Sequence, residues 1–514
     1  MKTMPEPKTV FDLLKAIQNP TTVALSAPNR PDLNYQGLLN LIESSVEALT
    51  KLGIGRNDRV AIVLPNGPEM ASAFVTIAVV ATTAPLNPNY RGEEYRFYLT
   101  DLKAKALVVE KDSTSPSIEV ANQLGIPVIR LHVRKTMAAG EFDIVANEGV
   151  QSTGVPDFSG YAQADDVGLV LHTSGTTSKP KLVPLTQRNL VTSAFNIGCA
   201  LALDPTDRSM NIMPLFHIHG LIAVILSSLA CGASVYCTPG FNALKAFKWF
   251  ADCKPTWYSA VPTMHQAILS RAENNTDIVS NMNLRFVRSS SSSLPPQVMA
   301  ELEKTFGCPV IEAYGMTEAT HQMASNPLPP ATRKPGTVGV AAGPEIAIMG
   351  ERGQFLRDGE TGEIVIKGEN VTYGYENNPR ANKENFTNGW FRTGDQGVLD
   401  DEGYLSITGR LKEIINRGGE KISPREVDEV LMDHPAVQQA VTFALPHDKL
   451  GEDVAAVVVL RDGVHIKEND IRNFTREHLA DFKVPRKIIF LDEIPKGETG
   501  KLQRIGLAEK LGLV

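Results

Sequence analysis

The segment VGLVLHTSGTTSKPK, residues 167–181, joins an apolar strand to a loop of hydroxyl and lysine side chains. Its first five residues are mostly aliphatic, which is typical of a buried strand. The loop glycine allows the backbone to approach a phosphate closely, and hydroxyl, amide and ammonium groups can neutralise phosphate oxygens. The segment therefore predicts a phosphate-binding loop at the carboxyl end of a buried strand.

This loop is not the common nucleotide-binding loop G-x-x-x-x-G-K-[ST]. No Gly-Lys pair stands five residues after Gly175, so that pattern fails. A loop of Ser, Thr and Gly is by itself also typical of a solvated turn. The function of the loop therefore depends on the rest of the chain.

Short apolar runs alternate with helical patterns from about residue 58 to residue 315, which indicates right-handed β-α-β units and largely parallel sheet covered on both faces. Ligand loops are then expected at the carboxyl ends of the strands. The Pro295-Pro296 pair favours a helix start, because proline is tolerated where the amide has no partner within the helix. The strand-like runs are DRVAIVLP, KALVVE, VGLVLHT, MNIMPLF, ASVYCT, PTWYSAVP, LRFVRSS and PVIEAY.

After about residue 336 the pattern changes to alternating strands separated by glycines, such as GEIVIKG and GYLSITG, which favours antiparallel hairpins or a small barrel. Ser423, Pro424 and Glu426 then predict a capping box that starts a new helix. The expected fold is α/β, with a large N-terminal domain of parallel α/β sheets plus a small β-barrel-like part. We expect this domain over residues 1–409 and a small α+β C-terminal domain over residues 410–514.

Composition excludes several functions. The 514 residues carry a net charge of −7, with a pI near 5.9, which argues against a nucleic-acid partner. The five cysteines show no CxxC pair, so a reduced intracellular protein without structural zinc is expected. No signal peptide, Ser-Lys-Leu end or bilayer-length apolar run is present, which favours the cytosol without a membrane partner. The oligomeric state is open, with a monomer favoured.

Five motifs follow one another along the chain: TSGTTSKPK, EAYGMTEAT (312–320), FRTGD (391–395), GRLKEIINRGGEKI (409–422) and PKGETGK (495–501). In this order they resemble the core motifs of the adenylate-forming superfamily, which contains acyl-CoA synthetases, carrier-loading adenylation domains and firefly-type luciferases. The resemblance covers about residues 20 to 510. It implies that a carboxylate attacks the α-phosphate of ATP, pyrophosphate leaves, and CoA then takes the acyl group.

The resemblance also assigns roles. Glu318 is implied to carry Mg²⁺, and Thr317 to hydrogen-bond the α-phosphate during the reaction. Tyr314 is implied to stack on adenine, while Asp395 accepts hydrogen bonds from the ribose with Arg410 behind it. Positive charge is needed at the developing phosphorane and at the leaving group. The residues implied to bind ATP or AMP are Thr173, Ser174, Gly175, Thr176, Thr177, Lys181, Ser290, Ser291, Ser292, Glu312, Ala313, Tyr314, Gly315, Thr317, Asp395 and Arg410.

The C-terminal motifs imply that the C-terminal domain moves during the reaction. In the superfamily the lysine equivalent to Lys501 enters the site for the adenylation step, on a mobile domain that rotates about the residue equivalent to Lys412. Rotation is implied to remove Lys501 and to bring in Gly418 and Gly419, whose backbone can line a narrow pantetheine tunnel.

Polar residues of the predicted acyl pocket indicate which carboxylic acid the enzyme activates. His217 matches the gate between the acyl pocket and the tunnel, and Ser289 and His321 favour a small polar acid, since unpaired buried donors cost roughly 1 to 3 kcal/mol each. FHIHG, VRSSSSSL and YGMTEATHQM together resemble plant and fungal oxalate-CoA ligases. Ligases for hydroxycinnamate or medium-chain acids remain the alternative, followed by a luciferase-like oxygenase and a carrier-loading domain. His217 and His219 are also spaced as metal ligands, but no third ligand has suitable spacing.

Lys501→Ala is expected to reduce adenylation by about a hundredfold or more, because one charge that stabilises the transition state is lost. Thiolation of a supplied acyl-adenylate should be largely intact. Pyrophosphate release and thioester formation are measured separately, and unchanged pyrophosphate release would refute the role of Lys501.

Overall fold

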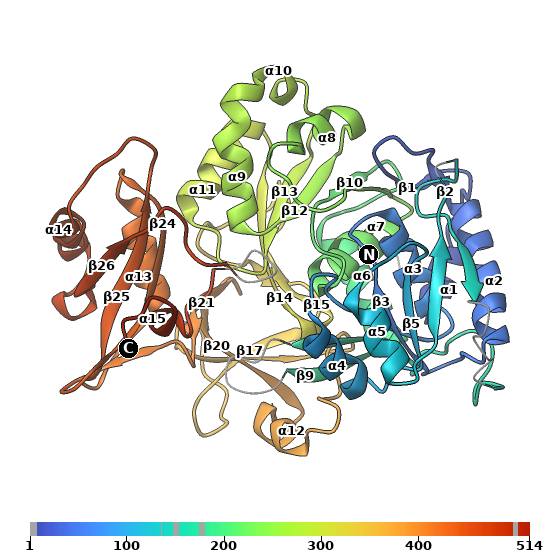
Figure 1. Cartoon of the computed structure of the whole chain (residues 1–514). Coiled ribbons are helices and arrows are strands. Elements are labelled where there is room, and N and C mark those ends of the chain that lie inside the picture. Colours follow the sequence, from blue (N-terminus) through green and yellow to red (C-terminus); the bar gives the residue numbers. More distant parts are fainter. Residues whose placement is uncertain (1–7, 135, 147–153, 174–179, 497–501) are drawn as a thin grey trace.

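Two α/β sheets form most of the N-terminal part of the protein (Figure 1). The computed structural model describes residues 8–134, 136–146, 154–173, 180–496 and 502–514. The seven-stranded sheet has the order β7-β6-β5-β3-β4-β8-β9, and the nine-stranded sheet has the order β16-β15-β14-β13-β12-β10-β11-β1-β2. The strands predicted as one alternating series are therefore divided between two sheets.

Most neighbours inside both sheets are parallel, as predicted, and antiparallel pairs lie at the edges. The first sheet contains β3 (Arg59–Val63), β4 (Thr82–Pro85), β5 (Ala106–Glu110), β6 (Val128–His132), β7 (Asp143–Ala146), β8 (Val167–Thr173) and β9 (Lys181–Thr186). The second contains β1 (Val23–Ser26), β2 (Leu33–Asn34), β10 (Arg208–Asn211), β11 (Ser234–Cys237), β12 (Trp257–Ala260), β13 (Phe286–Ser290), β14 (Val310–Met316), β15 (His321–Ser325) and β16 (Val340–Ala341).

Helices fill the space between the sheets and cover their outer faces. Phe74, Leu190 and Ile222, from α3, α6 and the π-helix η1, share one apolar core with residues of both sheets. Separate apolar clusters join α8, α9 and α11 to the nine-stranded sheet, and α4 and α5 to the seven-stranded sheet. The helices are α1 (Val10–Lys15), α2 (Tyr35–Lys51), α3 (Pro68–Ala78), α4 (Gly92–Asp101), α5 (Pro116–Gln123), α6 (Gln187–Ala200), η1 (His219–Leu226), α7 (Ser227–Ala230), α8 (Ala246–Cys253), α9 (Pro262–Ala272), η2 (Glu273–Asn275), α10 (Thr276–Val279), α11 (Pro296–Phe306) and η3 (Thr317–Ala319).

An antiparallel sheet follows, which confirms the predicted hairpins. Its order is β17-β18-β20-β19, with β21 also on β20. Because β20 pairs with β21 in the register Asp395↔Arg410, the strand carrying FRTGD lies beside the end of the strand that leads into the C-terminal part. The elements are β17 (Glu345–Met349), β18 (Gly362–Lys367), α12 (Pro379–Asn385), β19 (Phe386–Thr387), β20 (Trp390–Leu399) and β21 (Leu405–Arg410).

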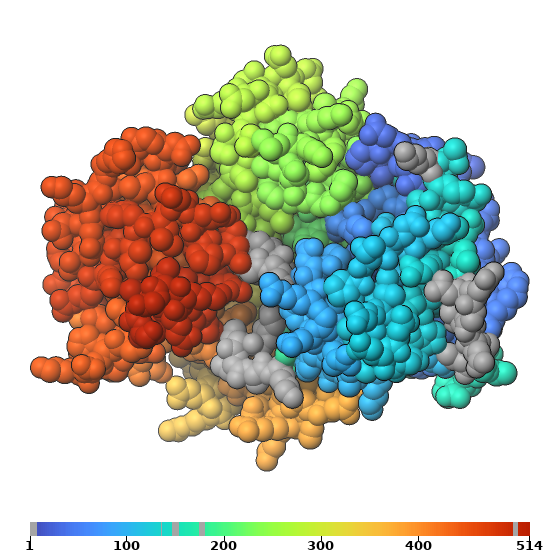
Figure 2. All heavy atoms as spheres, in the orientation of Figure 1, coloured from blue at the N-terminus to red at the C-terminus, as the bar shows by residue number. Residues whose placement is uncertain are grey.

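The chain after β21 forms a lobe of its own, shown in orange and red in Figures 1 and 2. Its two apolar clusters contain only residues from Ile415 onward. This supports a separate C-terminal domain, while the boundary at residue 410 and the rotation stay predictions. The elements are β22 (Ile415–Arg417), β23 (Glu420–Ile422), α13 (Pro424–Asp433), β24 (Val437–His447), β25 (Gly451–Leu460), α14 (Glu468–His478), η4 (Asp481–Lys483), β26 (Lys487–Phe490) and α15 (Leu507–Lys510).

Two helix starts test the predictions made from proline and from the capping box. Helix α11 begins at Pro296 after Pro295, as predicted. Helix α13 also begins where predicted, at Pro424, but the capping box is wrong, because the Ser423 side chain caps no amide of the helix. Its hydroxyl donates to the carbonyl of Thr408 instead, which ties the start of α13 back to β21.

Arg504 joins three segments of the C-terminal lobe. It donates to the Glu413 carboxylate at 2.8 Å, to the carbonyl of Thr442 at 2.6 Å and to the Asp428 carboxylate. Arg504→Leu leaves two largely buried carboxylates without their cation. We expect it to lower the free energy of unfolding of this lobe by about 2 kcal/mol.

The control for Arg504→Leu is Arg476→Leu, because Arg476 pairs with an exposed Asp481 on the surface and such pairs contribute about 0 to 1 kcal/mol. Hydrogen exchange of β24 and β25 reports on the lobe directly. Equal protection factors in the two variants would contradict a stabilising role for Arg504.

Candidate active site

Three strands, β14, β20 and β21, meet at the residues predicted to hold the nucleoside. The Tyr314 hydroxyl at the end of β14 donates to Asp395 Oδ2 at 2.5 Å, and Arg410 Nε at the end of β21 donates to Asp395 Oδ1 at 2.9 Å. Asp395 is only 5% exposed. The neighbouring Asp395 carboxylate raises the pKa of Arg410, so this guanidinium is fully charged. The two contacts fix a carboxylate and an aromatic ring beside each other.

Glu318, the predicted magnesium ligand, lies on the short helix η3, buried beside Lys181 and Tyr375. The Tyr375 hydroxyl donates to Glu318 Oε1 at 2.8 Å, and Lys181 Nζ lies 4.3 Å from the centroid of the Tyr375 ring. Burial raises the pKa of Glu318, and the Tyr375 hydrogen bond opposes that shift. Burial lowers the pKa of Lys181. The charge of Glu318 raises this pKa, and the charge of Lys412 lowers it. The charge of the predicted hinge residue Lys412 therefore acts on Lys181.

The strand register fixes the places of other predicted ATP residues. Thr173, the last residue of β8, is half-buried and pairs in register with Lys181. Thr317 is the half-buried first residue of η3. Ala313 pairs in register with Ser290, whose hydroxyl donates to the Ala313 carbonyl at 2.9 Å. Thr173 and Ser290 therefore end their strands and Thr317 directly follows β14, whereas Ala313 lies in the middle of β14.

The serine run after β13 leads to a buried histidine pair. Ser291 has φ 73°, a left-handed conformation that is uncommon outside glycine, whereas Ser292 is exposed. The Ser291 hydroxyl lies 3.0 Å from His219 Nδ1, and the His219 ring centroid lies 5.0 Å from that of His321. Both rings are at most 1% exposed. This cluster brings the predicted acyl residue His321 to the serine segment.

His321 is held in an unusual backbone conformation. Thr320 and His321 have φ 49° and 92°, and non-glycine residues in such conformations cluster at functional sites. Gly315 makes this conformation possible, because a Cβ on Gly315 would lie 2.1 Å from the carbonyl oxygen of His321. The glycine of the EAYGMTEAT motif is therefore required by the close approach of β14 to His321.

Arg288 was not predicted as a site residue, although it lies in this cluster. It is fully buried on β13, and its guanidinium lies 3.3 Å from Ser259 Oγ, 3.4 Å from His219 Nε2 and 3.2 Å from Gln322 Oε1. Burial lowers the pKa of Arg288 to about 9. The available signal was the place of Arg288 directly after Phe286 and Val287 in the strand-like run LRFVRSS.

Ser289 is not brought into this cluster. It is the next residue of β13 after Arg288, and successive side chains of a strand point to opposite faces. Its register partners are Ala260 and Glu312, whereas Arg288 pairs with Ser259. Ser289 is fully buried, and its hydroxyl lacks a hydrogen-bond partner among the described residues. The Ser289 side chain, which was predicted to contact the acyl group, therefore lies on the other face of the sheet from Arg288. Ser291 is the serine beside the histidines.

His217 precedes the π-helix η1. It is half-buried, and its Nδ1 accepts a hydrogen bond from the amide of His219 at 3.2 Å. The π-helix spans His219–Leu226, and such helices are rare and frequent at functional sites. His217 and His219 therefore belong to one turn, with His217 less buried than His219, as a gate requires.

The predicted tunnel glycines lie elsewhere. Gly418 and Gly419 form the exposed turn between β22 and β23, with φ 59° and 98°. In the part of the chain that the structure describes, no hydrogen bond or ion pair joins this turn to Glu318 or Asp395. Lys412 is exposed. The predicted residues Ser174, Gly175, Thr176, Thr177 and Lys501 lie outside the described residues.

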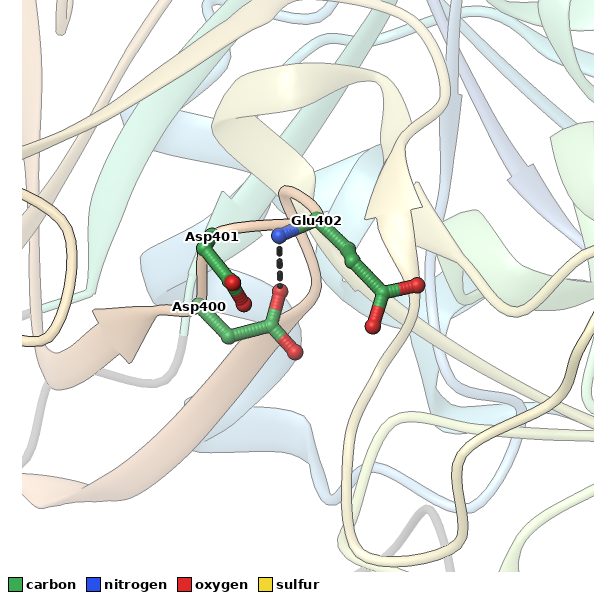
Figure 3. A group of neighbouring side chains, drawn as sticks. All are labelled: Asp400, Asp401 and Glu402. Carbon is green, nitrogen blue, oxygen red and sulfur yellow. Dashed lines mark hydrogen bonds between the residues drawn. The ribbon is translucent and has the colours of Figure 1, made fainter.

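A second group of acidic side chains has a structural function. Asp400, Asp401 and Glu402 form a turn after β20, in which the Glu402 amide donates to Asp400 Oδ1 at 3.0 Å (Figure 3). Lys334 Nζ pairs with Asp400 at 2.6 Å and with Glu402 at 2.8 Å. Lys334 therefore compensates part of the negative charge of this turn, through Asp400 and Glu402. Among the described helices, none combines the length and apolar character needed to cross a bilayer.

The fold and the site define an adenylate-forming enzyme. A family model for AMP-binding enzymes matches residues 15–376, and a model for the C-terminal domain of AMP-binding enzymes matches residues 426–501. The chain therefore belongs to the AMP-binding enzyme family, which confirms the resemblance of its motifs.

Individual relatives indicate which kind of AMP-binding enzyme the chain resembles. The chain is 45% identical to an oxalate–CoA ligase of Arabidopsis thaliana, over 94% of this chain and 95% of that protein. It is 45% identical to an oxalate–CoA ligase of Saccharomyces cerevisiae, over 88% and 87%, and 34% identical to a sulfoacetate–CoA ligase of Cupriavidus necator, over 99% of both. Among solved structures it resembles ATP-bound MatB from Rhodopseudomonas palustris, with TM-score 0.87, 28% identity, and 98% and 99% coverage. These similarities support an AMP-forming CoA ligase.

The raised pKa of the buried Glu312 carboxyl group can be tested through the dependence of stability on pH. Its carboxyl group is 1% exposed, Oε1 accepts from the Leu294 amide at 2.9 Å, and burial raises its pKa from 4.5 to about 7. Between these two pH values the unfolded carboxyl ionises while the folded one keeps its proton. The contribution of Glu312 to stability is therefore complete below pH 4.5 and falls by about 3 kcal/mol as the pH rises to 7.

The Glu312→Gln variant lacks this dependence. The stability of the wild type relative to Glu312→Gln should therefore fall between about pH 5 and pH 7 and stay constant above it. Melting temperatures of both proteins are measured across this range. A difference that is the same at every pH would contradict the raised pKa.

Proposed function

We propose that the protein is an oxalate–CoA ligase, which converts oxalate, ATP and CoA into oxalyl-CoA, AMP and diphosphate. The observation that carries this proposal is the polar, fully buried cluster of His219, His321 and Arg288 next to the serine segment. An aliphatic or aromatic acyl chain needs apolar walls, because polar groups deprived of water and of partners are costly to bury. A small acid with a second anionic group can instead pair with the buried guanidinium of this cluster.

The names of the relatives support a small acid with two anionic groups. Two proteins 45% identical to this chain are oxalate–CoA ligases, and the 34% identical relative is a sulfoacetate–CoA ligase. Oxalate carries two carboxylates, and sulfoacetate carries a carboxylate and a sulfonate. Because a second anion is common to both acids, the polar cluster is the part of the site that we assign to it.

The other predicted site residues divide the remaining work. Tyr314 stacks on adenine, Asp395 accepts hydrogen bonds from the ribose and Arg410 keeps that carboxylate in place. Lys181 and Thr317 hold phosphate oxygens, and Lys501 stabilises charge in the adenylation step. An oxalate oxygen bonds to the α-phosphorus while the bond to pyrophosphate breaks. The CoA sulfur then bonds to the acyl carbon while AMP leaves, after the C-terminal domain has rotated about Lys412.

Magnesium fits the carboxylate of Glu318. Protein sites commonly hold Mg²⁺ through one or two carboxylates together with substrate phosphates. Glu318 is a buried carboxylate next to the lysine of the phosphate loop, with Oε1 oriented by Tyr375. When bound, Mg²⁺ would neutralise phosphate charge at this point.

The alternatives differ in the acid or in the acceptor. A hydroxycinnamate or medium-chain ligase would need an apolar acyl pocket in place of the histidine cluster. A luciferase-like oxygenase and a carrier-loading domain share the adenylation step and differ afterwards. The proposal is therefore tested both by the acid and by the thioester product.

The test is AMP release that depends on both ATP and CoA, measured with oxalate, malonate, sulfoacetate, 4-coumarate, hexanoate and octanoate. Thioesters are identified by mass. We expect kcat/KM for oxalate to exceed that for each monocarboxylate by at least about a hundredfold, since an unpaired buried charge penalises an acid without a second anion. Preference for coumarate or octanoate would refute the assignment of the acid. AMP release without a thioester would refute the CoA ligase.

A further inference from the structure

Arg288 is a buried cation for which the described residues supply no counter-charge. The side chain is fully buried, and buried arginines are normally paired with acidic groups. Its contacts at Ser259, His219 and Gln322 are 3.2 to 3.4 Å long and come from uncharged or weakly basic groups. Its Nε lacks a hydrogen-bond partner among the described residues. No carboxylate of the described chain forms an ion pair with Arg288.

We propose that Arg288 determines the specificity for the acid, by pairing with the second anionic group of the substrate, the one that is not joined to AMP. This inference rests on the proposed function and names the residue that reads the second carboxylate of oxalate. A planar guanidinium can bind a carboxylate through two parallel hydrogen bonds, which gives orientation as well as affinity.

The place of Arg288 in the sheet fits this role. Ser259 and Arg288 are register partners on β12 and β13, and both contact His219. His219 in turn reaches Ser291, which lies directly after the end of β13, and its ring lies 5.0 Å from that of His321 at an interplanar angle of 53°. The cluster therefore leads from the carboxyl ends of the strands, where ATP is expected, to Arg288, two positions before the end of β13. In the proposed arrangement the reacting carboxylate of the diacid lies toward the nucleotide and the other toward Arg288.

The chemistry makes the second carboxylate a constant feature of the reaction. Joining one carboxyl group to AMP removes the negative charge of that group, and thioester formation does not restore it. The other carboxylate keeps its charge from binding to release. Arg288 therefore has the same partner in both half-reactions, and it acts on the binding of the acid rather than on phosphate departure.

The electrostatic cost of burying Arg288 without a counter-charge supports the same role. Burial without a counter-charge lowers the pKa of Arg288 to about 9, so the environment disfavours its charged form. An acid with a second anion removes this penalty when it binds, whereas a monocarboxylate leaves the guanidinium uncompensated. Arg288 therefore both attracts dianions and discriminates against acids with one charge.

Arg288→Gln and Arg288→Lys are compared with wild type, using oxalate and glycolate, which is similar in size but has one carboxylate. We expect Arg288→Gln to raise KM for oxalate by about a hundredfold while KM for ATP and CoA changes less than about threefold. The kcat/KM ratio of oxalate to glycolate should fall by at least about a hundredfold. Arg288→Lys should recover part of the oxalate affinity, because it keeps the charge.

The control is Arg285→Gln, in the segment before β13, since Arg285 forms its ion pair with Asp207. It should leave the ratio of oxalate to glycolate unchanged. Melting temperatures identify variants that fail to fold, and if Arg288→Gln does not fold, Arg288→Lys decides. A rise of at least about tenfold in KM for oxalate alone supports the proposal, whereas equal changes for ATP and oxalate assign Arg288 a structural role and overturn it.

The two hypotheses fail differently. If the wild type prefers sulfoacetate or malonate, the oxalate assignment is wrong, and the Arg288 variants are measured with the preferred dianion against its monoanionic analogue. If the wild type prefers oxalate but Arg288→Gln loses oxalate and glycolate activity in parallel, the ligase assignment holds and Arg288 does not read the second carboxylate.

Discussion

The need to bury charge next to a nucleotide governs this structure. Parallel strands end along one edge of a sheet, so polar side chains there come together in the interior of the domain. Each buried charge then needs a partner. Asp395 has both Tyr314 and Arg410, and Glu318 has Tyr375 with Lys181 nearby. Arg288 lacks an acidic partner among the described residues, and for this reason it becomes the most informative position in the site.

Much of the fold could be predicted because its signals are local. The alternation of apolar runs and helical patterns predicts parallel sheet, and Pro296 and Pro424 start helices where proline costs no hydrogen bond. The division of the strands into two sheets could not be predicted in this way, because it depends on which strands pair across long loops. The capping role of Ser423 was wrong for a related reason, since its hydroxyl found the Thr408 carbonyl of another strand.

The candidate site, like the fold, could be predicted only where its signals are local in the sequence. Tyr314, Asp395 and Arg410 stand in motifs with recognisable order, and the structure brings them within hydrogen-bond distance of one another. Ser289 shows how sensitive such a prediction is in a strand, where one position reverses the face. Tyr375 belongs to no motif used for the prediction, and Arg288 lies inside VRSSSSSL, where only the serines were assigned roles. Their importance follows from burial and from their contacts, which arise only after distant segments have folded together.

The distribution of charge also explains how nucleotide, acid and domain position are related. Lys181 and Lys412 are close enough for the charge of Lys412 to lower the pKa of Lys181. Two cations in this arrangement repel each other, and a triphosphate between them would remove that repulsion. Arg288 presents a separate cation at the acyl end. Under the proposed function, positive charge would lie at both ends of a small dianion that reacts with ATP, which is the arrangement needed to hold two substrates that repel each other.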